Sequence, residues 1–218
     1  MQLMVEGAAV IPTAALSRRN GDIDHPYRPD SDFYYLTHFP EPEAVAILIP
    51  NRKEGEFLLF CRNSDPEKEK WDGPRIGLTQ AVDHFGADQA FPIDELEDRL
   101  PQLLENQKKV HCFLGRYPDF DARLISAINQ VKGKIRSGTR APSGLADLGY
   151  LVHELRLFKQ PAEVKLMRKA AKISAEAHLR AIKTCKPGMT EYQLQAEVEY
   201  VFRNRGGLSS SYPPIVAG

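Results

Sequence analysis

The amino-acid sequence predicts an α/β domain with a mixed β-sheet flanked by helices, followed by the opening helices of a second domain. Two observations favour this fold class. Up to about residue 157, short apolar segments of strand length alternate with amphipathic segments of helix length, as in α/β domains. From Pro161 onward, two helical segments follow each other directly. We therefore expect two domains, covering residues 1–157 and 158–218.

Three apolar segments open the predicted sheet. Residues 4–12 and 43–49 have the length and composition of strands, and residues 57–60 follow a turn-like stretch over 51–55. Because a short turn joins antiparallel neighbours, segments 43–49 and 57–60 are expected to form a hairpin.

Two amphipathic helices and one strand complete the first domain. The helix expected over 94–105 carries a leucine face, formed by Leu96, Leu100, Leu103 and Leu104. Residues 110–114 form a short strand candidate. The helix expected over 119–132 directs three apolar side chains inward, those of Leu124, Ile125 and Ile128.

The second domain begins with two capped helices. Pro161 suits a first helical position, and this helix should end near Lys186-Pro-Gly188. Its apolar face is supplied by Val164, Met167, Ala171, Ala177 and Ile182. Thr190 and Gln193 match a capping box that opens the next helix. Residues 209–218 look like the start of a strand, whose edge needs a partner, so we expect the front part of a longer protein.

The charge balance restricts the class of partner. Lys plus Arg and Asp plus Glu each number 29, so the formal net charge is zero, which argues against nucleic acid or an anionic membrane as the partner. The apolar run 44–49 is far too short to span a bilayer, and the N-terminal segment has its basic residues after its apolar stretch, the reverse of a secretory signal. Three cysteines without a CxxC motif are typical of structural thiols, so we expect a cytoplasmic protein.

Motifs for catalysis are mostly absent from the sequence. It contains no GxSxG, GxxxxGK[ST] or HExxH motif, and its six histidines are scattered. Two acidic pairs, Asp22/Asp24 and Asp30/Asp32, could bind a hard cation, although turn-forming aspartates explain them at least as well. Trp71, the single tryptophan, lies in a stretch punctuated by glycine and proline and could be either a plug over the core or an exposed contact group.

Six short motifs, in order along the chain, resemble aminopeptidase P. They are Tyr27-Arg-x-x-Ser-Asp-Phe-x-Tyr-Leu36, Glu41-Pro-Glu-Ala44, Trp71-x-Gly-x-Arg-x-Gly77, Val152-His-Glu-Leu-Arg-Leu-Phe-Lys159, Lys186-Pro-Gly-Met189 with Glu191-Tyr192, and Ser211-Tyr212-x-x-Ile-Val. Each motif is weak by itself, but their order and spacing together are specific. The resemblance extends from about residue 22 to residue 218.

The resemblance implies an Xaa-Pro aminopeptidase, which removes the N-terminal residue of a peptide whose second residue is proline. It also implies an α/β N-terminal domain and a C-terminal α+β catalytic domain of the pita-bread fold, with two Mn²⁺ ions bridged by a hydroxide that attacks the scissile carbonyl. In that family the metal ligands follow the strand at Tyr212. The resemblance therefore implies that this chain contains no catalytic residue and no metal ligand, and that it is inactive by itself.

Four positions match residues that the family places around the substrate. Tyr212 corresponds to a tyrosine at the mouth of the metal pocket, and Trp71 to a tryptophan that reaches into the active site of a neighbouring subunit. Arg136 and Asp22 correspond to a charged pair near the entrance. These matches imply peptide substrates with proline in second position and a homo-oligomer, either a dimer or a tetramer.

Two alternatives remain open. One is a non-catalytic binding or oligomerisation module derived from the same N-terminal domain. The other is an Xaa-Pro dipeptidase, which shares the catalytic fold, although the motifs at 27–36 and 71–77 favour the aminopeptidase.

Overall fold

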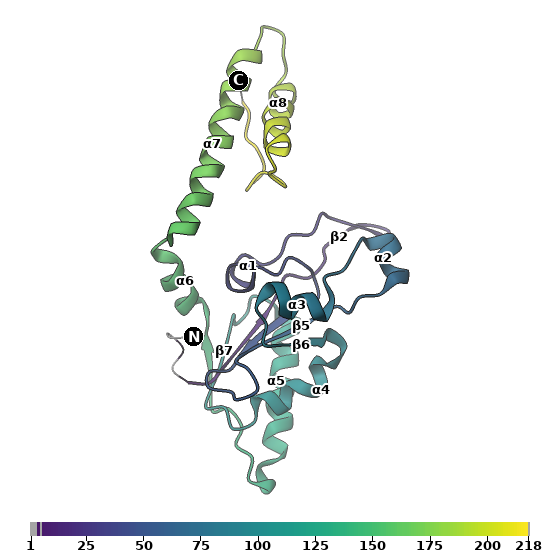
Figure 1. Cartoon of the computed structure of the whole chain (residues 1–218), viewed down its shortest axis with the longest axis vertical. Helices are drawn as coiled ribbons and strands as arrows, with labels where there is room; N and C mark the ends of the chain where they lie inside the picture. The colour runs from purple at the N-terminus through teal and green to yellow at the C-terminus, as the bar shows by residue number, and fades with distance from the viewer. Residues whose placement is uncertain (1–3, 5, 218) are drawn as a thin grey trace. The chain divides into compact units, whose positions relative to one another are not determined.

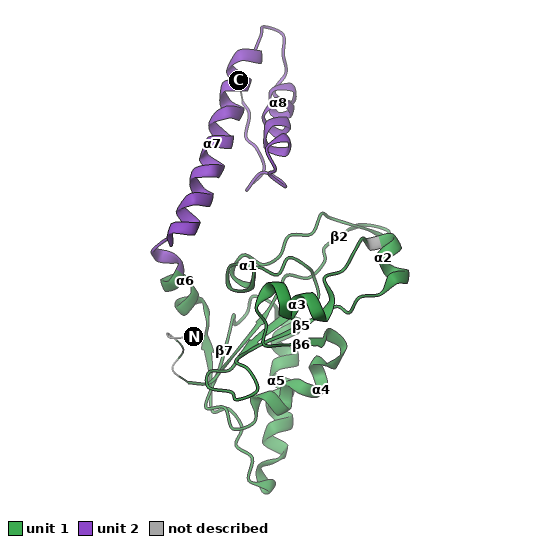
Figure 2. Ribbon diagram, in the orientation of Figure 1, with its two compact units in different colours: residues 1–155 green, residues 156–218 purple. Residues whose placement is uncertain are grey.

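The computed structural model describes residue 4 and residues 6–217, apart from the side chain of Asp72. The chain divides into two compact units, Met1–Leu155 and Arg156–Gly218 (Figure 2). Helix α6 (Gly149–Leu157) crosses the boundary between them. Among the described residues, every helix is too short or too polar to cross a membrane.

Unit 1 is built on a six-stranded sheet with the strand order β6-β5-β4-β1-β7-β8. Its strands are β1 (Ala8–Pro12), β4 (Val45–Leu48), β5 (Phe57–Cys61), β6 (Gln89–Pro92), β7 (Val110–Cys112) and β8 (Leu145–Asp147). Strand β4 is antiparallel to β1 and β5, whereas the other neighbours are parallel. The predicted mixed sheet is confirmed, and so is the hairpin, in which Val45 lies opposite Phe60.

Helices cover both faces of this sheet, because successive strand residues point to opposite sides (Figure 1). On one face, Val10 and Ile47 pack with side chains of α4 (Leu96–Leu104) and α5 (Pro118–Gly133). On the other face, Ile11 and Leu59 pack with side chains of α1 (Ser31–Thr37), α3 (Gly77–Phe85) and α6. The core of unit 1 therefore consists of two apolar layers with the sheet between them.

The helices expected over 94–105 and 119–132 are present as α4 and α5, with a short 3₁₀ turn η1 (Ile93–Glu95) before α4. Leu96, Leu100 and Leu104 are buried as predicted, and so are Leu124 and Ile128. Ile125 was wrongly expected to point inward, since its side chain is 49% exposed. It lies about 100° around the helix from Leu124, which is far enough to leave the buried face.

Several short elements have no periodic signal in the sequence. A two-stranded ribbon pairs β2 (Arg18–Asn20) with β3 (Ile23–Asp24), and a 3₁₀ turn η2 (Ile135–Ser137) follows α5. Helix α2 (Pro66–Asp72) begins at the capping residue Asp65, whose carboxylate accepts the backbone N–H groups of Glu67 and Lys68. Trp71 therefore lies in the last turn of a helix, where the sequence was interpreted as a loop.

Unit 2 is a pair of helices, α7 (Pro161–Thr184) and α8 (Glu191–Asn204). The predicted capping box of α8 is confirmed, because Thr190 and Gln193 bond each other's backbone. Arg180 of α7 pairs with Glu197 of α8. Of the apolar face expected on α7, only Ala177 is buried, whereas Met167 and Ile182 are exposed. Residues 208–217 are described but form no strand, so the strand start expected over 209–218 is not seen there.

Candidate functional site

The first resemblance motif takes part in a hydrogen-bonded group at the carboxyl end of β1. We call this group the hub; it consists of Thr13, Tyr27, Asp30, Asp32, Arg116 and Tyr117. The Tyr27 hydroxyl lies 2.8 Å from the Thr13 hydroxyl and donates to the backbone oxygen of Ala14 at 3.1 Å. Burial raises the pKa of Tyr27. This tyrosine thus joins the segment after β1 to the segment that leads into α1.

Asp30, in the same motif, combines two structural roles. Its Oδ1 accepts the backbone N–H groups of Asp32 and Phe33, both at 2.9 Å, and so caps α1. Its Oδ2 accepts the Tyr117 hydroxyl at 2.8 Å and the Arg116 guanidinium at 3.1 Å. Burial by itself would raise the pKa of Asp30, but these donors outweigh burial and hold the pKa below its usual value.

Arg116 completes this cluster, because it also bonds the buried carboxylate of Asp32 at 2.8 Å. Burial and the hydrogen bond to Asp30 raise the pKa of Tyr117. A phenol held in this protonated state is a donor at neutral pH and is not a general base. The cluster therefore fixes α1 against the amino end of α5, and the interpretation of Asp30 and Asp32 as turn-forming residues describes it better than a cation site.

The second motif supports the chain that follows Trp71. The buried carboxylate of Glu41 accepts the backbone N–H of Ile76 at 2.7 Å and lies 3.4 Å from the Arg62 guanidinium. Gly73, with a φ of +85°, ends α2. Gly77 opens α3 with a φ of +70°, a backbone conformation that side chains other than glycine rarely adopt. Glu41 and the two glycines thus fix the course of the backbone after Trp71.

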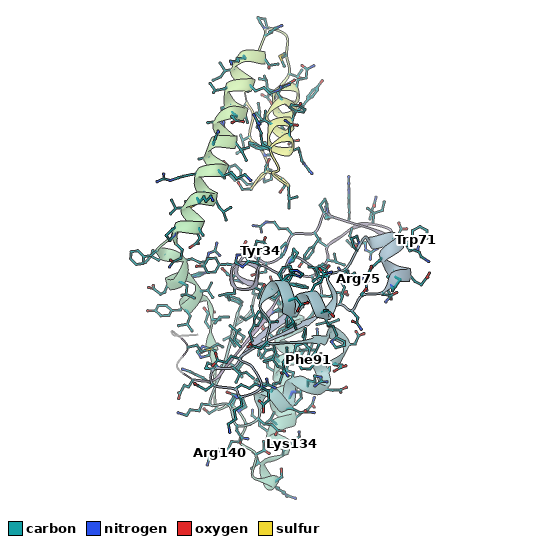
Figure 3. The ribbon with its side chains drawn as sticks, viewed as in Figure 1. Tyr34, Trp71, Arg75, Phe91, Lys134 and Arg140 are labelled. Carbon is teal, nitrogen blue, oxygen red and sulfur yellow. The ribbon has the colours of Figure 1, made fainter. Side chains whose placement is uncertain are left out.

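Trp71 itself is 90% exposed, so the alternative of a plug over the core is excluded within unit 1. It lies in the last turn of α2, at the right of unit 1 in Figure 3. An isolated, exposed indole on a short, capped helix is suited to contact another surface.

A cavity of about 410 Å³ in unit 2 is partly formed by Tyr212, whose side chain is 71% exposed. Its other walls are supplied by α8 and the segment after it, through Glu199, Phe202, Arg203, Ser209, Ser210, Ser211, Pro213 and Pro214.

Asp22 and Arg136 are not brought together within the chain. Asp22 lies in the turn between β2 and β3. Arg136 lies in η2, two residues after Lys134, which Figure 3 labels at the lower end of unit 1. Both residues are exposed. The ion pair formed by this ribbon joins Arg18 to Asp24.

A second cavity, of about 670 Å³, lies at the carboxyl ends of β1 and β7. Sheet edges of this kind often bind ligands. Its two arginines, however, already bind carboxylates, Arg116 those of Asp30 and Asp32 and Arg123 that of Glu97. The cavity therefore offers an anionic ligand no uncommitted guanidinium.

The described residues do not fit a metal centre, because no group of three or more His, Cys, Asp or Glu side chains converges among them.

The sequence analysis did not predict that the residues around Tyr27 and Asp30 form one structural unit, the hub. The only local signal of the hub was the concentration of aromatic and acidic residues over 25–36.

Two family models match the chain. Residues 1–112 match the aminopeptidase P N-terminal domain, and residues 165–218 match metallopeptidase family M24. The "Xaa-Pro aminopeptidase" of Escherichia coli strain K12 is 38% identical over 216 residues, which are 99% of this chain and 49% of that protein.

Solved structures agree with these matches. The aminopeptidase PepP of Pseudomonas aeruginosa has a TM-score of 0.94 and 50% identity, over 96% of this chain and 48% of that one. A zinc-substituted E. coli aminopeptidase P in complex with product has a TM-score of 0.88 and 38% identity, over 94% and 48%. The chain thus spans about half the length of the relatives that it matches.

Proposed function

The chain belongs to the aminopeptidase P family, and we propose that it forms the N-terminal portion of a metal-dependent Xaa-Pro aminopeptidase, which hydrolyses the bond between an N-terminal residue and a following proline. The observation that carries this proposal is the order of the two matched models on one chain. An aminopeptidase P N-terminal domain precedes the beginning of an M24 metallopeptidase domain. Peptides with proline in second position are the proposed substrates.

The chemistry of such a peptidase depends on metal ions, for which we propose two Mn²⁺ that supply the hydrolytic nucleophile. The described residues of this chain supply no group of side chains that could hold them. We therefore assign no catalytic step to these residues, and we expect the 218-residue chain to be inactive by itself.

The contribution proposed for this chain is to shape the surroundings of the substrate. The exposed indole of Trp71 is an apolar wall for the peptide in the active site of a neighbouring subunit, a role supported by its exposure and by the fixed backbone after α2. Tyr212 is the residue proposed at the mouth of the metal pocket, and its position beside a cavity supports this role.

Asp22 and Arg136 are the residues proposed as a charged pair near the entrance. Asp22 lies in the turn between β2 and β3 and Arg136 lies in η2, and no salt bridge joins them among the described residues. The homo-oligomer, a dimer or a tetramer, stays a proposal for the full-length enzyme. The expected cytoplasmic location stays a prediction.

A second candidate is a non-catalytic binding or oligomerisation module. The 90% exposed indole of Trp71, which is suited to contact another surface, is the observation that favours it. The M24 match over 165–218 favours the peptidase. An Xaa-Pro dipeptidase remains the close enzymatic alternative, and the length of the preferred peptide distinguishes it.

The test is peptide hydrolysis by the full-length, metal-loaded enzyme. We expect cleavage of Xaa-Pro-Xaa tripeptides and longer peptides, and Trp71→Ala should lower kcat/KM by about tenfold, because a buried aromatic contact typically contributes that much. Tyr150→Ala, at another exposed aromatic residue, is the matched control and should retain activity.

Metal content is measured on the same samples. Trp71→Ala should keep its metal, because an indole is not among the side chains that ligate metal ions of this kind. Loss of metal, or unchanged kcat/KM, would contradict the role of Trp71. A full-length enzyme that leaves Xaa-Pro peptides intact would contradict the proposed function itself.

A further inference from the structure

Positive charge is concentrated at one end of unit 1. The stretch 122–146 contains five basic residues and no acidic residue, although the whole chain is neutral. Four of the five lie at or after the carboxyl end of α5, namely Lys132, Lys134, Arg136 and Arg140. Lys134 and Arg140 are at the lower end of unit 1 in Figure 3.

A second segment joins this surface. The backbone N–H of Asn106 donates to the oxygen of Arg140 at 2.8 Å, and the N–H of Arg140 donates to the side chain of Asn106 at 3.1 Å. The N–H of Ser143 donates to the backbone oxygen of Lys108 at 2.9 Å. We call Lys108, Lys132, Lys134, Arg136 and Arg140 the cationic end. The hydrogen bonds given above hold the segment around Lys108 beside the segment around Arg140, without any bound partner.

Most of this charge is not neutralised. Lys108 pairs with Glu6, and Lys134 pairs with Glu105 at 2.7 Å. For the other three members of the cationic end, Lys132, Arg136 and Arg140, the described part of the chain provides no carboxylate within salt-bridge distance. All five side chains belong to exposed residues, so an anionic partner can reach them.

Apolar surface lies beside these cations. Ile135, between Lys134 and Arg136, is 60% exposed. A hollow of about 150 Å³ is lined by Ile125, Ile128, Asn129, Lys132, Pro142, Ser143, Gly144 and Leu145. It is smaller than the usual cavities for drug-sized ligands, which measure roughly 300–1,000 Å³, and matches the size of a single apolar side chain.

We propose that the cationic end binds an acidic, extended segment of a partner protein, with carboxylates on the lysines and arginines and one apolar side chain in the hollow. Charge complementarity supports an anionic partner. A protein segment fits better than single-stranded nucleic acid, because residues 121–149 contain no aromatic side chain on which bases could stack. The hollow favours a side chain over a phosphate group.

The test uses the whole 218-residue chain and a fluorescein-labelled peptide with a central leucine flanked by glutamates. Fluorescence anisotropy at low ionic strength should show binding that weakens at about 0.5 M salt, where charges are screened within a few ångströms. A peptide with glutamine for glutamate should not bind. A peptide with glycine for the leucine should bind more weakly.

Charge reversal locates the site. Lys132→Glu with Arg140→Glu should lower the affinity by about tenfold or more, since each exposed ion pair contributes a few-fold. Lys169→Glu with Lys172→Glu, on α7, changes the net charge equally and should bind as the wild type does. Circular dichroism checks that both variants are folded.

Three results would overturn the proposal. They are no binding of the glutamate peptide at low salt, equal loss in both double variants, and tighter binding of a single-stranded oligonucleotide or of vesicles containing phosphatidylserine than of the peptide.

Discussion

Replacing Asp30 by alanine tests whether the hub at α1 holds unit 1 together. The substitution removes the cap of α1, in which two backbone N–H groups donate to Oδ1 at 2.9 Å. It also removes the acceptor of the Tyr117 hydroxyl and one of the two carboxylates bound by Arg116. Arg116 keeps Asp32 at 2.8 Å, so this guanidinium stays partly satisfied.

The expected cost follows from these contacts. Losing a helix cap costs about 1 kcal/mol. Losing a hydrogen bond to a charged group costs roughly 1.5–3 kcal/mol. Because Arg116 keeps one partner, we expect Asp30→Ala to lower the free energy of unfolding by roughly 2–4 kcal/mol in total. With a urea dependence of about 1–3 kcal/mol per molar, the urea midpoint should fall by on the order of 1–2 M.

Two further variants separate the contributions. Asp30→Asn keeps a good capping side chain but loses the negative charge, so it should lie between the wild type and Asp30→Ala. Asp65→Ala removes the corresponding cap of α2, where the carboxylate makes no contact with a buried cluster. Its effect should be clearly smaller than that of Asp30→Ala. Urea unfolding followed by far-ultraviolet circular dichroism measures all of them.

The effect of Asp30 also depends on pH. Its pKa is lowered in the folded chain, so the unfolded chain binds a proton more readily. The stabilisation by the charged carboxylate is therefore present above the ordinary pKa of about 4 and is lost as the pH falls through the folded pKa. The difference between wild type and Asp30→Asn should be constant near neutrality and shrink in acid. If Asp30→Ala cost no more than Asp65→Ala, the hub would not have the stabilising role inferred here.

Two more predictions concern buried groups. Burial lowers the pKa of His111, so the unfolded chain binds the proton more readily, and the free energy of unfolding should fall as the pH drops below about 6.5. In urea unfolding, His111→Gln should lose less of this free energy between neutral and acidic pH than the wild type does. An identical loss in both proteins would contradict the prediction. Burial raises the pKa of the Cys61 thiol to about 12 and that of Cys112 to about 11, whereas Cys185 is exposed. A maleimide should therefore label Cys185 alone in the folded chain and all three cysteines in urea, as peptide mass spectrometry can verify; rapid labelling of Cys61 without urea would refute the burial argument.

The sequence by itself determined the elements whose signals are local. The hairpin of β4 and β5 follows from two apolar segments and a short turn, and α4, α5 and α8 follow from helical periodicity or a capping box. These signals lie within a few residues of one another, so the local chain determines them. Ile125 shows the limit, because periodicity gives the orientation of a helix face but not the width of its buried part.

Tertiary structure decided which distant residues meet. Asp30 and Arg116 are 86 residues apart, and Glu41 and Ile76 are 35 apart, yet each pair is in direct contact. The same packing separates Asp22 from Arg136 and joins the segments that carry Lys108 and Arg140 into one cationic end. No local pattern encodes such contacts, because they form only when β4, β1 and β7 pair side by side in the sheet and bring residues that are distant in the sequence together.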